Sequence, residues 1–498
     1  MARALMFQGT GSDVGKTVLV AGFCRLATRR GLKVRPFKPQ NMSNNAAVAG
    51  DGHGGFGEIG RAQWLQAFAC RTDPLVDMNP VLLKPQSETG SQIILHGKMF
   101  GQAKGRDYQK LKPRLLDAVM ESYRRLGDDA DLILVEGAGS PAEINLRAGD
   151  IANMGFATRA QVPVVLVGDI DRGGVIASLV GTHHILDPCD RAMIVGYLIN
   201  KFRGNVALFD EGINAIGRFT GWPQFGVVPW LSAAARLPAE DSVILEKPAV
   251  EKAQGLIIAV PVLPRIANFD DIDPLKAEPD VEVIFVKPGN RLPENADLVI
   301  LPGSKSTIAD LAALRAQGWD RDLRAHRRRG GHIVGLCGGY QMLGRILADP
   351  DGLEGTVQST EGLGLLDIRT VLKAEKSVRI STGRSCRFDA PVDGYEIHLG
   401  ETTGPDCARP VALIGERPDG ASSADGKVFG TYIHGLFSSD GFRTAFLESL
   451  GLSASRSNHM QRVDRALDEI ADKLAEHVDF DGMLSIAEGF ARRAVNGD

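Results

Sequence analysis

The feature that most constrains this chain is an alternation of short apolar runs with longer helical patterns, which extends through most of its 498 residues. In parallel sheets both faces are covered by helices, so that the strands read as continuous apolar runs. The alternation therefore predicts an α/β fold with doubly wound, mainly parallel sheets. The clearest candidates for buried strands are Leu132–Val135, Val162–Val167, Met193–Ile199, Val283–Val286, Leu298–Leu301 and Ile333–Leu336.

The length of the chain exceeds what one hydrophobic core normally supports, so we expect more than one domain. The alternation breaks at the charged stretch Pro238–Gln254, and the strand-like Leu256–Val260 then starts a second series. We therefore predict one α/β domain over residues 1–250 and another over 251–450. From Asn458 onwards the sequence is polar and helix-prone, which indicates a C-terminal helical tail over residues 451–498.

Charge and cysteine content argue against a nucleic-acid-binding, membrane-bound or disulfide-rich protein. The formal net charge is -4, which does not favour a nucleic-acid or membrane partner. The six cysteines are scattered without metal-like spacing, which is typical of a reducing compartment. No apolar run approaches the roughly 18 residues that a membrane span needs. We expect a cytoplasmic protein without a signal peptide.

A glycine-rich loop, Gly9–Thr17, stands between the first apolar run and the first helical pattern. Such loops turn their backbone N–H groups toward a phosphate, and the helix N-terminus adds a positive end. We expect Gly11 and Gly15 to shape this loop and Lys16 to reach the β- and γ-phosphates of ATP. The hydroxyl of Thr17 is a candidate ligand for Mg²⁺.

Two acidic residues are further candidates for the metal. Glu136 ends the predicted strand Leu132–Val135 and is followed by glycines, which suggests the close approach of a ligand. Asp51 lies in another glycine-rich turn. The alternative for both is a surface acid in a loop.

The glycine loop together with Val135–Gly139 resembles the dethiobiotin synthetase superfamily, whose members use ATP to activate a carboxylate or carbamate. The resemblance implies that Lys38, in a Lys-Pro pair after the second strand, lies near the transferring phosphoryl group. It also implies that Asn200 lies near the adenine.

A second motif, Gly335–Gly339, follows the predicted strand Ile333–Leu336 and has the pattern GxCxG of a nucleophile elbow. The helix that follows favours the thiolate of Cys337 over the thiol. The alternative is a buried structural cysteine. His434 is the candidate base, because it follows a short strand well downstream of the cysteine. Among the other histidines, His183 and His184 fit a helix surface, and His398 has no evident partner.

The backbone N–H groups of Gly303 and Gly338 are candidates for an oxyanion hole. Residues 255–445 resemble class I, or triad-type, glutamine amidotransferases, which implies L-glutamine as the nitrogen donor. Members of that family typically have a glutamate two residues after the histidine, and Leu436 stands there in this chain. The sequence therefore predicts a Cys337–His434 dyad in which backbone or water orients the histidine.

Longer strings extend the resemblance over nearly the whole chain. They lie at residues 38–45 (KPQNMSNN), 58–63, 79–85, 168–174 (GDIDRGG) and 200–204, and they are similar to the cobyric acid synthase family. This implies ATP- and glutamine-dependent amidation of peripheral carboxylates on a corrinoid, adenosylcobyrinic acid a,c-diamide, through an acyl phosphate. The polar side chains expected to contact the corrinoid are Asn41, Ser43, Asn44 and Arg172.

Two alternatives remain at this stage. One is a related amidoligase, such as cobyrinic acid a,c-diamide synthase or an enzyme similar to CTP synthase. The KPQNMSNN and GDIDRGG strings argue against it. The other is a non-enzymatic P-loop partition or regulatory ATPase, against which the presence of both Cys337 and His434 argues.

Overall fold

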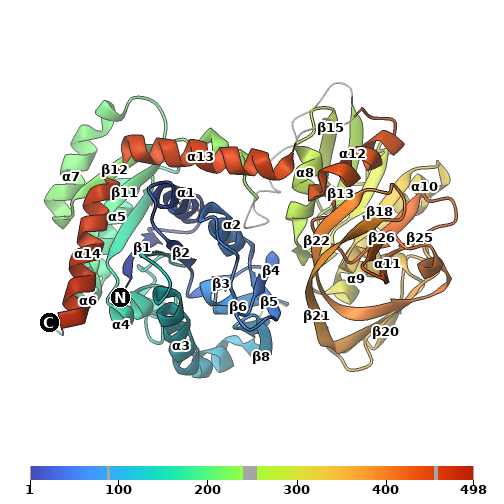
Figure 1. The fold of residues 1–498 in the computed structure, drawn as a ribbon, viewed down its shortest axis with the longest axis horizontal. Coiled ribbons are helices and arrows are strands. Elements are labelled where there is room, and N and C mark those ends of the chain that lie inside the picture. The colour runs from blue at the N-terminus through green and yellow to red at the C-terminus, as the bar shows by residue number, and fades with distance from the viewer. Residues whose placement is uncertain (1, 87–89, 239–254, 454–457, 497–498) are drawn as a thin grey trace.

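The structure is a computed structural model that describes residues 2–86, 90–238, 255–453 and 458–496, and two α/β bodies lie side by side in it (Figure 1). The first body is built on six parallel strands in the order β12-β11-β10-β1-β9-β2. Their bounds are β1 Arg3–Gly9, β2 Val34–Phe37, β9 Leu132–Glu136, β10 Val164–Asp169, β11 Ile194–Phe202 and β12 Gln224–Pro229. The three apolar runs predicted in this half are β9, β10 and β11, so those predictions are confirmed.

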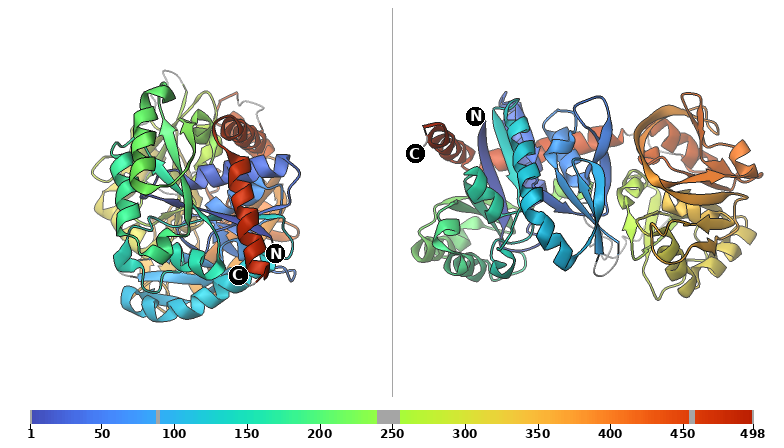
Figure 2. Two further views of the ribbon diagram at one scale, coloured as in Figure 1. Left: turned by 90° about the vertical axis from the view of Figure 1, so that its left-hand side faces the viewer. Right: turned by 90° about the horizontal axis from the view of Figure 1, so that it is seen from below.

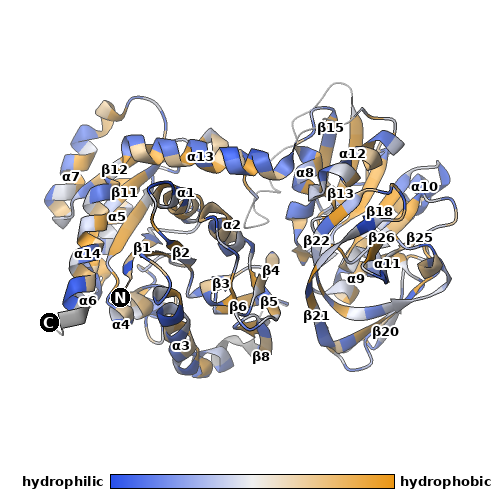
Figure 3. Ribbon diagram, in the orientation of Figure 1, coloured by the Kyte–Doolittle hydropathy of each residue, from blue (hydrophilic) through white to orange (hydrophobic). Residues whose placement is uncertain are grey.

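Helices pack on both faces of this sheet and form two separate apolar cores with it. They are α1 Lys16–Arg29, α2 Arg61–Ala69, α3 Gly105–Gly127, α4 Met154–Ala160, α5 Val175–Ile185, α6 Pro188–Arg191 and α7 Asp210–Thr220. In Figure 3 the central strands are coloured as apolar, as expected for a sheet covered on both faces. The β1–α1 loop and the end of β9 lie at the same edge, because neighbouring parallel strands end together.

Two small sheets extend the first body toward the second. Strands β3 Gln40–Met42, β6 Val81–Pro85, β7 Gly90–Leu95 and β8 Lys98–Lys104 form one of them, and β4 Ala46–Gly50 pairs with β5 Phe56–Gly60 in the other. Ala46 and Val48 of β4 join an apolar cluster with Tyr395 and Ile397 of the second body. The two bodies therefore share a packed interface.

The second body contains a sheet in the order β15-β13-β16-β18-β26-β25, parallel except for β25. Its strands are β13 Leu256–Pro261, β15 Val281–Val286, β16 Leu298–Leu301, β18 His332–Leu336, β25 Ala421–Ser422 and β26 Val428–Thr431. Its helices are α8 Asp273–Lys276, α9 Thr307–Ala316, α10 Trp319–Arg328, α11 Gly338–Leu343 and α12 Asp440–Ser449. The strands predicted in this half are confirmed as β13, β15, β16 and β18.

A mainly antiparallel layer flanks this sheet, and the apolar alternation did not predict it. Its longest strands are β21 Arg369–Ser385 and β22 Pro391–Thr403, which pair along most of their length. The shorter strands are β19 Ile346–Ala348, β20 Ser359–Glu361, β23 Ala412–Ile414 and β24 Arg417–Asp419. One face of β21 is exposed to solvent, so its sequence lacks the continuous apolar run of a parallel strand.

The C-terminal segment returns to the first body as α13 His459–His477 and α14 Phe480–Asn496 (Figure 2). Leucine and isoleucine side chains of α13 enter the core that contains α1. Arg25, which is 1% exposed, forms ion pairs with Asp464 at 2.7 Å and Asp468 at 3.0 Å. The predicted helical tail is thus helical, and it packs into the core of the first body. The predicted boundary near residue 250 lies outside the described residues.

Candidate active sites

The glycine-rich loop connects β1 to α1 at the carboxyl edge of the first sheet. Gly15 precedes α1 with φ 93°, a conformation that favours glycine. A side chain at Gly15 would also lie 2.5 Å from the amide nitrogen of Asn200. The Nζ atom of Lys16 lies 3.4 Å from the carbonyl oxygen of Gly11 and 3.2 Å from that of Gly139. The side chain of Lys16 therefore lies over the loop, close to the N-terminus of α1. A cation and a helix N-terminus at one place form a site that suits an anion.

Glu136, at the end of β9, joins the loop to the rest of this site. It is 1% exposed, and one of its carboxylate oxygens accepts hydrogen bonds from Thr17 Oγ1 at 2.7 Å and Lys38 Nζ at 2.9 Å. The other oxygen accepts from Gln66 Nε2 of α2 at 2.6 Å. The structure thus brings together Lys16, Thr17, Lys38 and Glu136, four residues that sequence patterns had singled out separately.

A hydroxyl and a carboxylate oxygen in contact are ligands of the kind that Mg²⁺ prefers, with water and phosphate oxygens completing its shell. Thr17 and Glu136 therefore fit a nucleotide-bound magnesium ion. Asp51 does not contact them: its carboxylate accepts from the N–H groups of His53 and Gly55 at 2.9 and 2.8 Å, which lowers its pKa and closes the β4–β5 turn. Its role as a metal ligand stays a prediction. Within the described residues, no three His, Cys, Asp or Glu side chains gather as a metal site.

Two other predicted residues border the phosphate loop. Asn200, in β11, donates to the carbonyl oxygen of Val14 at 2.8 Å. Arg172 is largely exposed and forms an ion pair with Asp13 of the loop at 3.3 Å. The structure therefore places Arg172 beside the loop, apart from the other residues expected to contact the corrinoid.

Those other residues lie in β3 and in the segment that follows it. Asn41 is buried and donates to Gln63 Oε1 at 3.0 Å, and the hydroxyl of Ser43 accepts from the N–H of Asn45 at 3.1 Å. Asn44 lines a pocket that also contains Cys337 of the second body. The segment predicted to bind the corrinoid thus reaches the second candidate site.

Cys337 lies at the turn from β18 to α11, with φ 51° and ψ -106°. Positive φ is rare for residues other than glycine, and it is the strained conformation that exposes a nucleophile at an elbow. A side chain at Gly339 would lie 2.1 Å from the carbonyl oxygen of Leu301, so only glycine fits beneath the turn. The predicted elbow is confirmed.

His434 faces Cys337, and its other ring nitrogen has a carboxylate partner. His434 Nδ1 lies 2.7 Å from Asp271 Oδ2, and the second oxygen of Asp271 accepts from the N–H of Gly435 at 2.7 Å. The prediction that backbone or water orients His434 is therefore wrong. Asp271 comes from the short helix Phe269–Ile272, 163 residues upstream, and it supplies the acid that is missing at Leu436. Cys337, His434 and Asp271 thus have the arrangement of a Cys-His-Asp triad.

Asp271 and Cys337 change the pKa of His434. Burial disfavours a charged imidazole, but the Asp271 carboxylate and Cys337 raise the pKa of His434 to about 10. These neighbours favour the imidazolium form of His434. A cation beside a cysteine favours the thiolate, which is the nucleophilic form.

The pocket around Cys337 is lined by residues of both bodies, among them Asn44, Lys84, Lys305, Glu354, Gly303 and Gly338. Gly303 and Gly338 line this pocket together with Cys337, and their role as donors of an oxyanion hole stays a prediction. Burial and the neighbouring Lys376 and Lys84 lower the pKa of Lys305 to about 7, and burial raises the pKa of Glu354 to about 7. One cationic and one acidic side chain thus border the same pocket as the thiol.

The comparisons with known proteins agree with this pair of sites. Residues 5–244 match the CobQ/CobB/MinD/ParA nucleotide binding domain, and residues 257–442 match the CobB/CobQ-like glutamine amidotransferase domain. Cobyric acid synthase of Rhizobium johnstonii is 69% identical over 96% of this chain and 97% of its own length. Those of Mesorhizobium japonicum and Brucella canis are 67% and 66% identical over 98% of this chain and their full length.

The chain belongs to the cobyric acid synthase family.

Membership identifies the chain as a glutamine-hydrolysing carbon–nitrogen ligase of cobalamin biosynthesis, with a nucleotide-binding half and a glutamine amidotransferase half. The alternative of a non-enzymatic regulatory ATPase is not favoured, nor is that of another amidoligase. None of the helices in the described ranges combines the length and apolar character needed to cross a bilayer.

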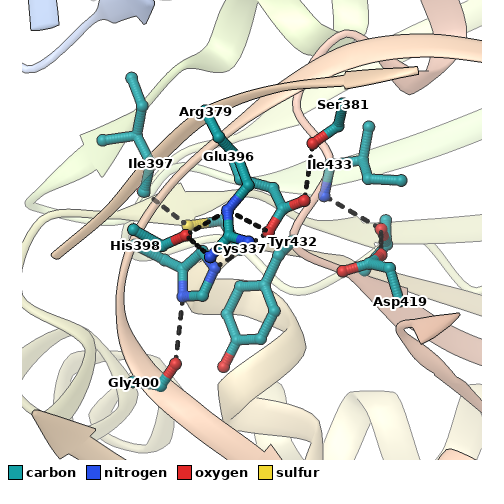
Figure 4. Close-up of polar contacts among 12 residues, drawn as sticks. Cys337, Arg379, Ser381, Glu396, Ile397, His398, Gly400, Asp419, Tyr432 and Ile433 are labelled. Carbon is teal, nitrogen blue, oxygen red and sulfur yellow. Dashed lines mark hydrogen bonds and ion pairs between the residues drawn. The ribbon is translucent and has the colours of Figure 1, made fainter. Parts of the chain in front are cut away.

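His398 has partners that the sequence did not reveal (Figure 4). Its ring nitrogens lie 3.1 Å from the carbonyl oxygen of Gly400 and 3.3 Å from Glu396 Oε2, and its ring stacks on Tyr432 at 3.7 Å. Glu396 in turn accepts from the hydroxyl of Ser381 at 2.6 Å. These contacts hold the middle of β22 in place beside Cys337, whose sulfur lies 3.6 Å from the carbonyl oxygen of Ile397.

A charged triplet at the interface was also missed. Glu58 of β5 forms ion pairs with Lys84 of the first body and Lys376 of the second. Burial opposes its ionisation, but the two lysines lower the pKa of Glu58 to about 2. No local pattern could have revealed this triplet, because its members belong to three strands far apart in the sequence.

Proposed function

We propose that this chain amidates peripheral carboxylates of adenosylcobyrinic acid a,c-diamide to give adenosylcobyric acid, consuming ATP and glutamine. The observation that carries the proposal is the pocket around Cys337, because Asn44 and Lys84 of the nucleotide-binding half line it together with the triad. Ammonia released at the sulfur would thus appear at a surface shared with the synthetase half.

Glutamine hydrolysis begins when the Cys337 thiolate attacks the side-chain carboxamide carbon. The N–H groups of Gly303 and Gly338 stabilise the negative oxygen of the tetrahedral intermediate. The His434 imidazolium, held by Asp271, donates its proton to the departing nitrogen, so that ammonia leaves and a glutamyl thioester remains. Water, activated by the now neutral His434, then releases glutamate.

Glutamine itself carries an α-carboxylate and an α-ammonium group, both of which must be held away from the sulfur. Lys305 and Glu354 border the pocket and supply the two complementary charges. We assign Lys305 to the α-carboxylate and Glu354 to the α-ammonium group. Bound glutamine would keep both side chains ionised.

In the synthetase half a corrinoid carboxylate attacks the γ-phosphorus of ATP, ADP leaves, and an acyl phosphate forms. Lys16 and Lys38 would stabilise the charge on the transferring group, and backbone N–H groups of the glycine loop would hold the remaining phosphates. Thr17 and Glu136 would hold Mg²⁺, which would supply further charge neutralisation on the phosphates. Ammonia then attacks the acyl carbon and expels phosphate, which leaves the amide.

Asn41, Ser43 and Asn44 are our candidates for polar contacts to the corrinoid, with Arg172 on the side of the phosphate loop. One ATP site can serve several carboxylates only if each product leaves and rebinds in a new orientation. Binding energy spent on a single orientation would trap the intermediate, so we expect weak, polar contacts.

The test is a time course of the reaction followed by mass spectrometry. We expect stepwise amidation with partly amidated corrinoids free in solution, one ATP and one glutamine consumed per amide, and four amides at the end. A single amidation would contradict the substrate assignment. So would activity on 7,8-diaminopelargonate or UTP without activity on the corrinoid, although either result would leave the glutamine and ATP chemistry intact.

A further inference from the structure

The segment that carries Asp271 is held by residues of the synthetase half. The N–H of Asn268 donates to Asn45 Oδ1 at 2.7 Å, and the side chain of Asn268 bonds the N–H and the carbonyl oxygen of Ala46, each at 3.1 Å. Asn268 has φ 51°, so these contacts also stabilise an unfavourable backbone conformation. The glutaminase acid therefore depends on the other body for its position.

An ion pair crosses the interface one residue before Asp271. Arg61 Nε of the synthetase half lies 2.8 Å from Asp270 Oδ2, and the two side chains are 11% and 5% exposed. The guanidinium of Arg61 also lies over the ring of Trp64, 4.1 Å from its centroid. Asp270 and Asp271 are consecutive in the same short helix, so the position of one carboxylate constrains that of the other.

Arg61 is itself held at the start of a rigid element. Its N–H donates to the carbonyl oxygen of Asn45 at 3.1 Å, and it is the first residue of α2. Further along α2, Gln63 contacts Asn41 and Gln66 contacts Glu136. The helix that presents Arg61 to the glutaminase is thus anchored in the ATP site.

We infer that Arg61 is a positioning residue for glutamine hydrolysis, supplied by the synthetase half, that holds the Asp270–Asp271 pair so that Asp271 orients His434. A buried carboxylate that loses its cation must move or take up a proton. Without Arg61, Asp270 would be such a carboxylate directly beside Asp271. The bond from Asp271 to His434 Nδ1, which fixes the ring and stabilises its charge, would then be disturbed.

The test compares four variants of the full chain. Arg61→Ala removes the cation, Arg61→Lys retains it in a shorter side chain, and Arg61→Ala combined with Asp270→Asn removes both charges. Arg462→Ala is the matched control, because Arg462 also crosses between the bodies but donates to a backbone oxygen, that of Ala277, at 2.7 Å. Each variant is assayed for glutaminase kcat and KM, for ammonia-supported amidation, and for thermal unfolding.

We expect Arg61→Ala to lower glutaminase kcat about 5- to 30-fold with little change in the KM for glutamine. Arg61→Lys should lie between Arg61→Ala and the wild type. The double variant should recover part of the loss, because it leaves no charge buried alone. Ammonia-supported amidation should persist in all of them, which separates this inference from the proposed synthetase function.

Wild-type glutaminase kcat in Arg61→Ala would overturn the inference. So would equal losses of glutamine- and ammonia-supported amidation in a folded Arg61→Ala protein, since that would indicate a general structural role. If Arg61→Ala does not fold, the double variant decides, and a wild-type kcat there overturns the inference. A loss in Arg462→Ala as large as in Arg61→Ala would overturn it too.

Discussion

In both halves of this enzyme the candidate site lies at the end of a parallel strand, but the segments that supply its residues differ. In each half a strand of a parallel sheet ends in a glycine-rich turn that leads into a helix, β1 to α1 and β18 to α11. At the proposed ATP site the residues that we assign to the phosphates follow one another in the chain, and Glu136 and Lys38 join them from neighbouring strands. The glutaminase triad instead combines three distant segments, and its acid is held from the other body.

This difference shows what each site needs. A phosphate is recognised largely by backbone N–H groups and a helix end, which one contiguous loop can supply. A nucleophile needs a base and an orienting acid at fixed distances, and such groups can come from any part of a fold. We therefore expect the ATP site to be disturbed mainly by changes within its own half, and the glutaminase site by changes in both.

The largest expected effect separates the two sites outright. Cys337→Ala removes the nucleophile and should lower glutamine-supported amidation by about 10⁵-fold, since loss of one triad member disables the whole unit. Amidation with high concentrations of ammonium salt should persist. Cys407→Ala, a half-buried thiol of the same body, is the control. Loss of both activities in a folded Cys337→Ala protein would refute the division into two sites.

Asp271→Asn tests whether the acid from the distant segment belongs to the triad. We expect glutaminase kcat to fall by about 10⁴-fold, because an amide does not hold the protonated ring. Asp271 contributes to raising the pKa of His434 to about 10, so this pKa should drop in the variant and the imidazolium should be lost at a lower pH. The rate at which a glutamine-like electrophile labels Cys337, measured against pH, reports that change.

Leu436→Ala is the contrasting variant, because it alters the position where related amidotransferases have their acid. Leu436 is 1% exposed within an apolar core, so the substitution should cost about 2–5 kcal/mol of stability. Glutaminase kcat should stay near the wild-type value, whereas His434→Ala should abolish it. Equal losses of kcat in Asp271→Asn and Leu436→Ala would contradict the triad.

Lys16→Ala tests the proposed ATP site of the first body. Removing a cation that stabilises the transferring phosphoryl group should lower amidation by about 10³-fold with either nitrogen source. Glutamine hydrolysis should survive, because the triad lies in the other body. Lys33→Ala, which removes an exposed lysine of the same body, should be neutral. Near-normal amidation with ammonia in Lys16→Ala would contradict the proposal that the glycine-rich loop binds the phosphates of ATP.

The smallest effect concerns glutamine recognition. Lys305→Met or Glu354→Gln should raise the KM for glutamine about 10- to 100-fold, as expected for one charged hydrogen bond. Below pH 7 Glu354 gains a proton, and above pH 7 Lys305 loses one, so wild-type glutaminase kcat/KM should be greatest near pH 7. Each variant should lack one limb of that profile. Lys373→Met is the control. An unchanged pH profile of kcat/KM in both Lys305→Met and Glu354→Gln would show that neither side chain binds glutamine.

The sequence by itself determined the α/β class and the two glycine-rich turns, and it singled out Cys337 and His434 as candidates. Each apolar run and each turn depends on a few consecutive residues. An apolar run indicates a buried parallel strand. Glycines at fixed spacing permit a turn that can hold a strained nucleophile or point its N–H groups at a phosphate. Gly15–Thr17 and Gly335–Gly339 can therefore be recognised in the sequence alone, and the structure has the predicted turns at both places.

Only the tertiary structure decided the rest. Asp271 is one of several acids in a short run, and nothing local distinguishes it from Asp270, which pairs with Arg61 instead. The return of α13 to the first body, with Arg25 between Asp464 and Asp468, depends likewise on packing between segments more than 400 residues apart. The physical reason is that buried charges are stabilised by whichever partner the fold brings within hydrogen-bonding distance, and spacing along the chain does not determine that partner.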